Sequence, residues 1–398
     1  MAMRIVNARI VTGDRLLERA TVEVRDGRIA AVAPADGAVG AGDYDARGMT
    51  LLPGFIDMHC HGGLGRDLMD MDASHWQALC RFLARHGVTS FLPTSTASSS
   101  DVLGSFLTFA AAQRREPVID GAEVLGVHLE GPYLEIEYAG MAPVKWLRHL
   151  QADEYNGWLA TGMVRRITAS LAMPGGDDLL AACARHGVLL SLGHTTCSAE
   201  DVRKWAAQGL RHVTHLYNAM SRAEKRGPVR WCGCVEGSLA EPLVTAEIIG
   251  DGNHVPEFLF RIAAICKGRA GITVASDSTP LTGAVKEGET VRYGGESGEW
   301  MMVRQGMALS LDGRSLVGSI MPLGAMLPRI LRWLDGDWLA AARYFATNAA
   351  DLLGEGNRKG RIAAGCDADL VLVDDAAAIA AVWVRGKALA LDTSPCIS

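Results

Sequence analysis

Short apolar segments alternate with helix-like stretches through the middle of the chain, and this alternation restricts the folds that the chain can adopt. Helix-like stretches such as 74–86 and 199–208 separate apolar segments of strand length. Strands that alternate with helices are typical of parallel βα units, and eight units in succession predict an α/β fold, a (β/α)8 barrel of the TIM type. The predicted strands are 54–59, 88–94, 123–129, 165–171, 188–193, 212–217, 243–250 and 271–276.

The two ends of the chain have a different pattern, with short β-branched runs and no helix-like stretches between them. These runs are 3–11, 21–33, 368–373 and 381–387. The dipeptide Asp26-Gly27 interrupts the second run and is favoured in tight hairpins. We therefore predict one β domain made from residues 1–52 and 358–398, beside a barrel domain of residues 53–357.

Composition is that of an ordinary globular protein. The chain has 398 residues, of which 49% are hydrophobic and 21% charged, so it can bury the core of a barrel. A net charge of −6 without a Lys/Arg block argues against nucleic acid or an anionic membrane as a partner. Without an apolar leader or a bilayer-spanning run, the expected location is the cytoplasm. Nine scattered cysteines are read as reduced thiols, and Cys232 and Cys234 as packing or loop residues.

Two histidines one residue apart end the first predicted strand. His59 and His61 follow the apolar run that begins at Pro53, and Gly62 and Gly63 come directly after them. Side chains at i and i+2 of a strand project from the same face, so both imidazoles can reach one point. Imidazole nitrogen suits zinc and neighbouring transition ions. The pair predicts a metal site, although an HxH alone is also consistent with an ordinary polar turn.

Polar residues also end the later strands, where the chemistry of a barrel is located. Glu130 ends the third strand and is predicted to be a further metal ligand. His128 shares its face and could be a ligand, a partner of a ligand or a hydrogen-bonded wall residue. His194 and His215 follow the fifth and sixth strands as further ligands. Asp277 follows the eighth strand, where a carboxylate could act as the base that takes a proton from water.

Specific motifs occupy these strand ends and the closing segment of the chain. They are PGFIDMHCHG, GVHLEGPY, SLGHTT, THLYNAM, DGNH at 251–254, SDS at 276–278 and the closing GRIAAGCDADLVLVD. With these motifs the chain resembles the amidohydrolase superfamily and, within it, the N-acetylglucosamine-6-phosphate deacetylase family. This resemblance covers nearly the whole chain and implies a (β/α)8 barrel beside a small β-sandwich built from both termini.

The resemblance also implies a cofactor and a reaction. Glu130, His194 and His215 would hold one divalent metal, and His59 and His61 would complete a second position, so that one or two ions are expected. Zinc is the first expectation, with Fe, Mn or Co as alternatives. The implied activity is hydrolysis of the N-acetyl group of an amino-sugar phosphate, N-acetylglucosamine-6-phosphate first, to glucosamine-6-phosphate and acetate, by a homodimer.

Substrate contacts are carried over from the same motifs. The resemblance places a phosphate near Asn218 and Ala219 and near an arginine that corresponds to Arg226. Two alternatives stay open: Arg226 as a solvated charge of its loop, and Arg230 as a competing candidate. His254 corresponds to a histidine that contacts the sugar. An arginine fork and backbone amides are a common way to hold a phosphate.

The chain departs from the family pattern around the substrate. Ala142 stands where the family has a histidine that polarises the acetyl oxygen, and loss of one such donor costs ~2.7–4 kcal/mol in the transition state. The segments 226–229 and 318–322 also differ from the family. Three alternatives therefore stay open: another N-acyl amino sugar such as N-acetylgalactosamine-6-phosphate, a non-phosphorylated amide, and a barrel that binds without catalysis.

Overall fold

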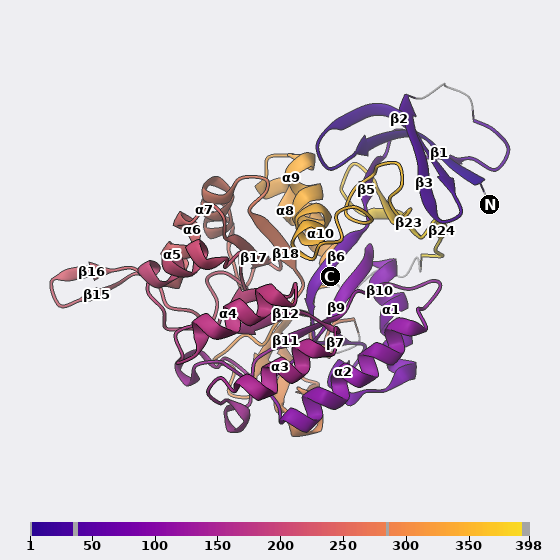
Figure 1. Ribbon diagram of the computed structural model, residues 1–398. Coiled ribbons are helices and arrows are strands. Elements are labelled where there is room, and N and C mark those ends of the chain that lie inside the picture. Colours follow the sequence, from indigo (N-terminus) through magenta and orange to yellow (C-terminus); the bar gives the residue numbers. More distant parts are fainter. Residues whose placement is uncertain (1, 35–38, 284–285, 392–398) are drawn as a thin grey trace.

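Two sheets organise the molecule, one in the middle of the chain and one made from both of its ends, and they lie side by side in Figure 1. The computed structural model describes residues 2–34, 39–283 and 286–391. Parts of the predicted terminal β domain, namely 1, 35–38 and 392–398, lie outside the described residues.

The middle sheet is the predicted parallel barrel. Within the described chain its strands are β6 (Phe55–Cys60), β9 (Val88–Ser95), β11 (Val127–Glu130), β12 (Val164–Ala169), β13 (Leu189–Leu192), β14 (His212–Val213), β17 (Thr245–Ile249) and β18 (Ile272–Ala275). The sheet closes where the backbone N–H of Ser276, beyond β18, donates to the Asp57 carboxylate of β6 at 3.2 Å. The backbone N–H of His61 donates to the Ser278 carbonyl at 2.8 Å in the same seam. The (β/α)8 prediction is confirmed.

Helices cover the barrel because their sequences place apolar residues on one side. They include α1 (Ala73–Arg85), α2 (Ser100–Arg115), α3 (Ala152–Ala160), α4 (Gly176–Arg185), α5 (Ala199–Gln208), α7 (Glu257–Lys267) and α8 (Leu323–Trp333). Helix α1 buries Trp76, Leu79 and Leu83, which are three and four residues apart and so share a face. Its first turn is capped by the Asp72 carboxylate, which accepts the backbone N–H groups of Ser74 and His75.

Most of the predicted barrel strands are somewhat shorter in the structure, and two of them are interrupted or end early because of the backbone conformation of a single residue. The predicted strand 123–129 is divided into β10 (Glu123–Val124) and β11, because Gly126 has a φ of 150°. A Cβ atom at Gly126 would lie 2.8 Å from the Met163 carbonyl oxygen, so the bend requires glycine. The predicted strand 212–217 ends already at Val213, because His215 turns the chain away with a φ of 29°.

The ends of the chain form one mainly antiparallel sheet, as the prediction of a β domain from both termini requires. Its strands are β1 (Ala2–Val11), β2 (Leu16–Arg25), β3 (Arg28–Pro34), β4 (Tyr44–Asp45), β5 (Thr50–Pro53), β22 (Leu370–Val373), β23 (Ile379–Val384) and β24 (Lys387–Ala388). The β2–β3 hairpin turns at Asp26 and Gly27, both with positive φ, which matches the predicted tight turn. Gly54 alone separates β5 from β6, so the chain passes directly from this sheet into the barrel.

Two insertions extend the barrel's loops. A hairpin of β15 (Glu224–Arg226) and β16 (Val229–Trp231) projects away from the barrel at the left of Figure 1. After β18, a three-stranded antiparallel sheet of β19 (Thr290–Tyr293), β20 (Glu299–Arg304) and β21 (Met307–Ser310) was not predicted from the sequence. None of the helices in the described residues has the length and apolar character needed to cross a membrane.

Candidate active site

Polar side chains converge at the carboxyl ends of the barrel strands, as the sequence predicts. They are His59, His61, Glu130, His194, His215 and Asp277, and none is more than 8% exposed. Three of them take a left-handed backbone conformation just beyond their strands, with φ of 50° at His194, 29° at His215 and 46° at Asp277. Such conformations are uncommon outside glycine and gather at functional sites, where surrounding structure holds them in place. The backbone thus aims these side chains inward.

One cluster consists of Glu130, His194 and His215. The Nε2 atoms of His194 and His215 lie 3.1 Å apart. Each of them also lies 3.2 Å from Oε1 of Glu130. These three residues come from the ends of β11, β13 and β14, so the cluster depends on the closed barrel.

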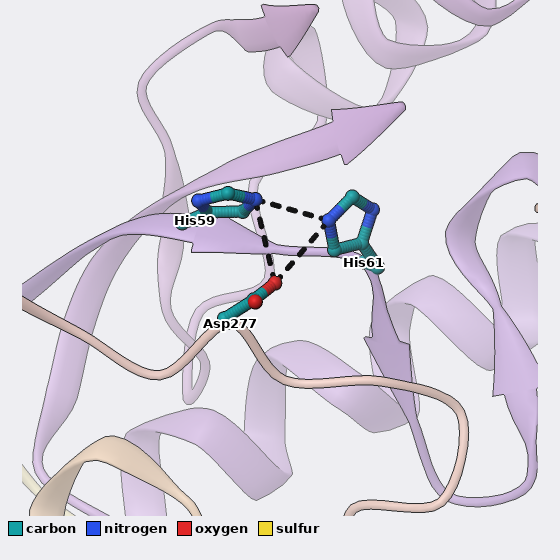
Figure 2. A group of neighbouring side chains, drawn as sticks. All are labelled: His59, His61 and Asp277. Atoms are coloured by element: carbon teal, nitrogen blue, oxygen red, sulfur yellow. Dashed lines mark hydrogen bonds and ion pairs between the residues drawn. The ribbon is translucent and has the colours of Figure 1, made fainter. Parts of the chain in front are cut away.

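The second cluster consists of His59, His61 and Asp277, which point toward one another in Figure 2. The Nε2 atoms of the two histidines lie 3.0 Å apart, and Oδ1 of Asp277 lies 3.4 Å from each. Glu130 joins the two clusters, because its Oε1 lies 3.4 Å from Nε2 of His59 and its Oε2 lies 3.2 Å from Nε2 of His61. The carboxylate therefore stands between both groups of histidines.

The opposite ring nitrogen of three histidines is already occupied. Nδ1 of His59 lies 3.0 Å from the Glu247 carboxylate, Nδ1 of His194 lies 2.6 Å from the Tyr138 carbonyl, and Nδ1 of His215 lies 3.1 Å from the Asn218 carbonyl. Since these acceptors take the proton on Nδ1, the lone pair on Nε2 faces the cluster. Acceptors behind a histidine orient it in this way in metal sites.

This arrangement fits a divalent metal. Within each cluster the ligand atoms all lie within 4.8 Å of one another, and they are the imidazole and carboxylate groups that zinc and related ions bind. Two Nε2 lone pairs at about hydrogen-bond distance repel each other unless a proton or a cation lies between them. The donor set therefore suits one or two ions.

Charge around the clusters is concentrated and buried. Burial opposes ionisation of Glu130, but the imidazoles of His59, His194 and His215 hold its pKa well below the usual range. Burial likewise opposes protonation of His59, but the nearby carboxylates raise its pKa well above the usual range. The pKa of Asp277 is lowered to about 2 against the effect of burial by the two histidines of its cluster. At neutral pH Asp277 is thus a carboxylate that can accept a proton.

A buried ion pair supports the site from within the barrel, and the sequence-based prediction missed it. Arg166 and Glu247 are fully buried, and Nη2 of Arg166 lies 2.9 Å from Oε1 of Glu247, the atom that also faces His59. The backbone N–H of His215 donates to the same oxygen at 3.2 Å. The sequence did contain a sign of this pair, because Arg166 and Glu247 each stand inside an apolar strand and charged side chains are buried only when they are paired.

His128 belongs to the barrel wall. Its Nδ1 lies 3.2 Å from the Thr94 hydroxyl and its Nε2 lies 2.7 Å from the Thr168 hydroxyl, so both nitrogens are engaged. Its ring packs edge-on against His59, with ring centroids 4.6 Å apart. Burial and the neighbouring Arg166 hold its pKa well below the usual range. Of the alternatives left open, the hydrogen-bonded wall residue describes this geometry.

The residues predicted to contact substrate fall in different places. Asn218 and Ala219 form the turn after His215, and the Asn218 carbonyl accepts from that histidine. His254 lies on the loop after β17, where its Nδ1 is 2.8 Å from the Asp251 carboxylate. A small cavity lies nearby, lined in part by Asp251, Asn253, Ser319 and Ile320.

Arg226 is not brought to the clusters within one chain. It lies on the exposed β15–β16 hairpin, which projects outward in Figure 1. Its Nε lies 2.7 Å from the Glu224 carboxylate, and its guanidinium lies 3.6 Å from the ring centroid of Trp231. The competing candidate Arg230 is on the same hairpin. In this structure the contacts of Arg226 are therefore with its own hairpin and not with the clusters.

Two further residues, Ala142 and Tyr293, differ in the hydrogen bonds that their side chains can make. Ala142 packs in a small apolar cluster with Ala97 and Leu134 and offers no hydrogen bond from its side chain. Tyr293, at the end of β19, was missed by the sequence-based prediction, and its hydroxyl oxygen lies 3.0 Å from Nε2 of His61. Burial, followed by the charges of Glu130 and Asp277, raises the pKa of Tyr293 well above its usual range, so this hydroxyl keeps its proton.

Known proteins share this architecture along nearly the whole chain. The model of the amidohydrolase family matches residues 50–389. The N-acetylglucosamine-6-phosphate deacetylase of Bacillus subtilis (strain 168) is 30% identical over 97% of this chain and 96% of its own length. The N-acetylgalactosamine-6-phosphate deacetylase of Escherichia coli O157:H7 is 27% identical over 95% of this chain and 97% of its own length.

A solved structure agrees with these relatives. The structure of a mutant N-acetyl-D-glucosamine-6-phosphate deacetylase from Mycobacterium smegmatis, in complex with N-acetyl-D-glucosamine-6-phosphate, covers 98% of both chains with a TM-score of 0.87 and 26% identity. The barrel and its cluster of imidazole and carboxylate groups are those of an amidohydrolase. The chain belongs to the amidohydrolase family and, within it, to the family of the N-acetylglucosamine-6-phosphate deacetylases.

Proposed function

We propose that this enzyme hydrolyses the N-acetyl group of an amino-sugar phosphate, with N-acetylglucosamine-6-phosphate as the first substrate. The observation that carries the proposal is the convergence of two ligand clusters on Glu130, with the Asp277 carboxylate beside them. Membership of the family supports the reaction class, because its relatives of similar length carry that activity in their names. The products are the amino-sugar phosphate and acetate.

The cofactor is one or two divalent ions, zinc first, with Fe, Mn or Co as alternatives. Glu130, His194 and His215 would hold the tighter ion, and His59 with His61 would complete the second position with Glu130 between the two. When bound, such an ion supplies Lewis acidity, which polarises a carbonyl and lowers the pKa of a water molecule from ~15.7 toward ~7.

Asp277 is the proposed general base and acid. Its carboxylate accepts a proton from the water molecule whose oxygen forms the new bond to the acyl carbon. The carbon–nitrogen bond then breaks, and Asp277 returns that proton to the departing amine. A pKa of about 2 in the unliganded site keeps Asp277 ionised at neutral pH, which the first step requires.

Phosphate recognition is proposed for Asn218, Ala219 and Arg226, and sugar recognition for His254. Arg226 would act on the site of a second chain, since its own hairpin projects outward. An apolar stripe on α7 supports a homodimer, because Phe258 and Ile265 are 81% and 84% exposed and Ile262 lies between them. A stripe of this kind is typical of a surface that another chain covers.

We place the enzyme in the cytoplasm. The cysteines in the described residues are free thiols, including buried Cys234 at the start of α6 (Cys234–Ala240) and exposed Cys232 before it. Unpaired cysteines suit a reducing compartment.

A second substrate has its own support. A relative that is 27% identical to this chain carries the name N-acetylgalactosamine-6-phosphate deacetylase. The galacto epimer is therefore the second candidate. A change of epimer alters one hydroxyl of the sugar and leaves the acyl group and the hydrolysis unchanged.

Acetate release tests the proposal. Zinc-loaded protein would be assayed with N-acetylglucosamine-6-phosphate, its galacto epimer and unphosphorylated N-acetylglucosamine, with the Asp277→Asn variant as the control. We expect the highest kcat/KM for a phosphorylated sugar and little release by the variant. Metal-loaded protein that binds these sugars without releasing acetate would instead be a binding protein.

A further inference from the structure

Negative charge develops at the acyl oxygen as water attacks, and a hydrogen-bond donor placed there lowers the barrier of amide hydrolysis. The loop after β11 does not supply one from Ala142, whose side chain packs with Ala97 and Leu134. Asp277 is the residue proposed to handle the proton of the attacking water, and Glu130 lies among the imidazoles of both clusters. A side-chain donor that adds to the Lewis acidity of a bound ion has to come from another element.

Tyr293 places a hydroxyl at the clusters from the inserted sheet. Its oxygen lies 3.0 Å from Nε2 of His61, the same nitrogen that faces Glu130 at 3.2 Å and Asp277 at 3.4 Å. The Tyr293 ring packs edge-on against His61 with centroids 4.9 Å apart, and the residue is only 7% exposed. The hydroxyl thus lies on the side of His61 where both carboxylates are found, close to the atoms that react.

The backbone around Tyr293 is held on both sides. Tyr293 pairs with Glu299 in the β19–β20 ladder. The next residue, Gly294, donates its backbone N–H to the Asp67 carboxylate at 2.7 Å, and Asp67 also accepts from the backbone N–H of Met69 at 2.8 Å. This anchoring ties the inserted sheet to the loop after β6, the strand that carries His59 and His61.

Glycine makes the close turn beyond Tyr293 possible. Gly294 has a φ of 93°, and a Cβ atom there would lie 2.5 Å from the side chain of Thr96. A Cβ atom at Gly298 would lie 1.8 Å from the Tyr293 carbonyl oxygen. The hydroxyl is therefore positioned before any substrate binds, which is the property that makes a donor effective in catalysis.

We propose that Tyr293 is a catalytic residue whose hydroxyl donates a hydrogen bond to the acyl oxygen of the substrate. This inference rests on the proposed deacetylase function. The water oxygen bonds to the acyl carbon, Asp277 takes the water proton, the carbon–nitrogen bond breaks and the proton passes to the amine nitrogen. Tyr293 keeps its own proton throughout and stabilises the oxygen on which charge accumulates. In the free site its hydroxyl faces His61.

The Tyr293→Phe variant tests this role in the full-length, zinc-loaded enzyme. Phenylalanine fills the same buried space, so we expect unchanged metal content by mass spectrometry. The kcat for acetate release should fall ~10²–10³-fold, with KM changed by less than about threefold. The matched control is Tyr344→Phe, which removes another buried hydroxyl, bonded to the Gly268 carbonyl, and should leave kcat unchanged.

Inhibitor binding gives a second readout that does not depend on turnover. A phosphonamidate analogue, with tetrahedral phosphorus in place of the acyl carbon, should bind Tyr293→Phe more weakly by the same factor as the loss in kcat, whereas the affinity for the amine product should not change. Loss of metal from the variant would show that Tyr293 only positions His61, and would overturn the inference.

Different results would contradict the role of Tyr293 and the proposed deacetylase function. An active wild-type enzyme together with an equally active, metal-replete Tyr293→Phe variant would overturn the role of Tyr293 alone. A metal-loaded wild-type enzyme that releases no acetate from any N-acetyl amino sugar would overturn the proposed function, and this inference with it.

Discussion

Glu123 and Glu130 lie at the two ends of one predicted barrel strand, and their surroundings differ. Glu123, in β10 at the amino end, lies 2.9 Å from Nη2 of Arg358 and 2.9 Å from Nζ of Lys359. Glu130, at the carboxyl end of β11, is faced by imidazoles at 3.2 to 3.4 Å. Both carboxylates have a pKa below the usual range, but for different reasons.

This difference indicates that Glu123 stabilises the fold, whereas Glu130 is suited to bind a metal ion. Every charge near Glu123 has a partner of opposite sign, since Lys359 also lies 2.6 Å from Asp369, so this cluster is complete without a ligand. At Glu130 the neighbours are lone pairs that point at the same space, and they become favourable partners only when a cation or protons are added. Burial of both clusters is therefore explained by ion pairing at one end and by metal binding at the other.

Removing the proposed base at the carboxyl end should have the largest effect. Asp277→Asn keeps the shape of the side chain but cannot accept a proton, so we expect kcat to fall ~10²–10⁴-fold while metal content stays nearly intact. Acetate release and metal analysis on the same preparation check this. The exposed Asp335→Asn change serves as the control, and wild-type turnover in Asp277→Asn would remove Asp277 from the mechanism.

At the amino end, the effect should be on stability and should depend on pH. The pKa of Glu123 falls from 4.5 to about 2, because ion pairs with Arg358 and Lys359 outweigh burial. A carboxyl group with a lowered folded-state pKa stabilises the fold above its unfolded value, and this stabilisation disappears as the pH falls through the folded value. Glu123→Gln should thus lower the free energy of unfolding by roughly 3 kcal/mol at neutral pH.

Urea unfolding of the wild-type protein and of Glu123→Gln at several pH values measures the difference between their free energies of unfolding. This difference should become smaller as the pH falls from about 4.5 toward 2, because the wild-type carboxylate is then protonated. Acetate release at neutral pH should be unchanged in the folded variant. A difference that is equally large at low pH would mean that Glu123 stabilises through packing.

The smallest of these effects concerns the hairpin far from both clusters. If Arg226 holds the phosphate in a second chain's site, Arg226→Ala should raise KM for the phosphorylated sugar ~10–150-fold, because a charge-assisted contact worth ~1.5–3 kcal/mol is lost. The unphosphorylated sugar should be hardly affected, and Lys225→Ala on the same hairpin is the control.

Mixing two weakly active variants tests whether Arg226 acts on the site of a second chain. Arg226→Ala and Asp277→Asn chains, each weakly active alone, should regain activity in hybrid dimers that contain one site with both residues intact. Equal losses of Arg226→Ala on phosphorylated and unphosphorylated substrates would show that Arg226 is structural and would point away from sugar phosphates.

The parts predicted from the sequence depend on local patterns. The order of strands and helices follows from apolar periodicity, and the hairpin at Asp26 and Gly27 follows from the conformations these two residues favour. The convergence of His59 and Glu130 was predictable because parallel strands of a barrel end at the same face.

The rest depends on contacts between distant segments. Tyr293 is 232 residues away from His61 in the sequence, and Glu247 is 188 residues away from His59. A local sequence pattern therefore cannot predict either contact. The strand predicted over 212–217 ends early because the barrel requires a sharp turn at His215, which apolar composition does not reveal. Comparison of motifs likewise could not predict that Arg226 lies on a projecting hairpin.

We propose, from the family resemblance, that Glu130, His194 and His215 form the tighter of the two metal positions. His194→Ala should lower bound metal to near zero at the tighter position, whereas the double change His59→Ala with His61→Ala should lose at most the second ion. If the double variant lost all metal, the ranking of the two positions would be reversed.

The most direct test of the central claim counts divalent metal per chain by mass spectrometry in Glu130→Gln and Glu123→Gln, both prepared with zinc. We expect Glu123→Gln to keep the metal content of the wild-type chain and Glu130→Gln to lose most of it, because of these two glutamates only Glu130 lies among converging imidazole nitrogens. Full metal content in Glu130→Gln, or a wild-type chain that takes up no zinc, would contradict the account.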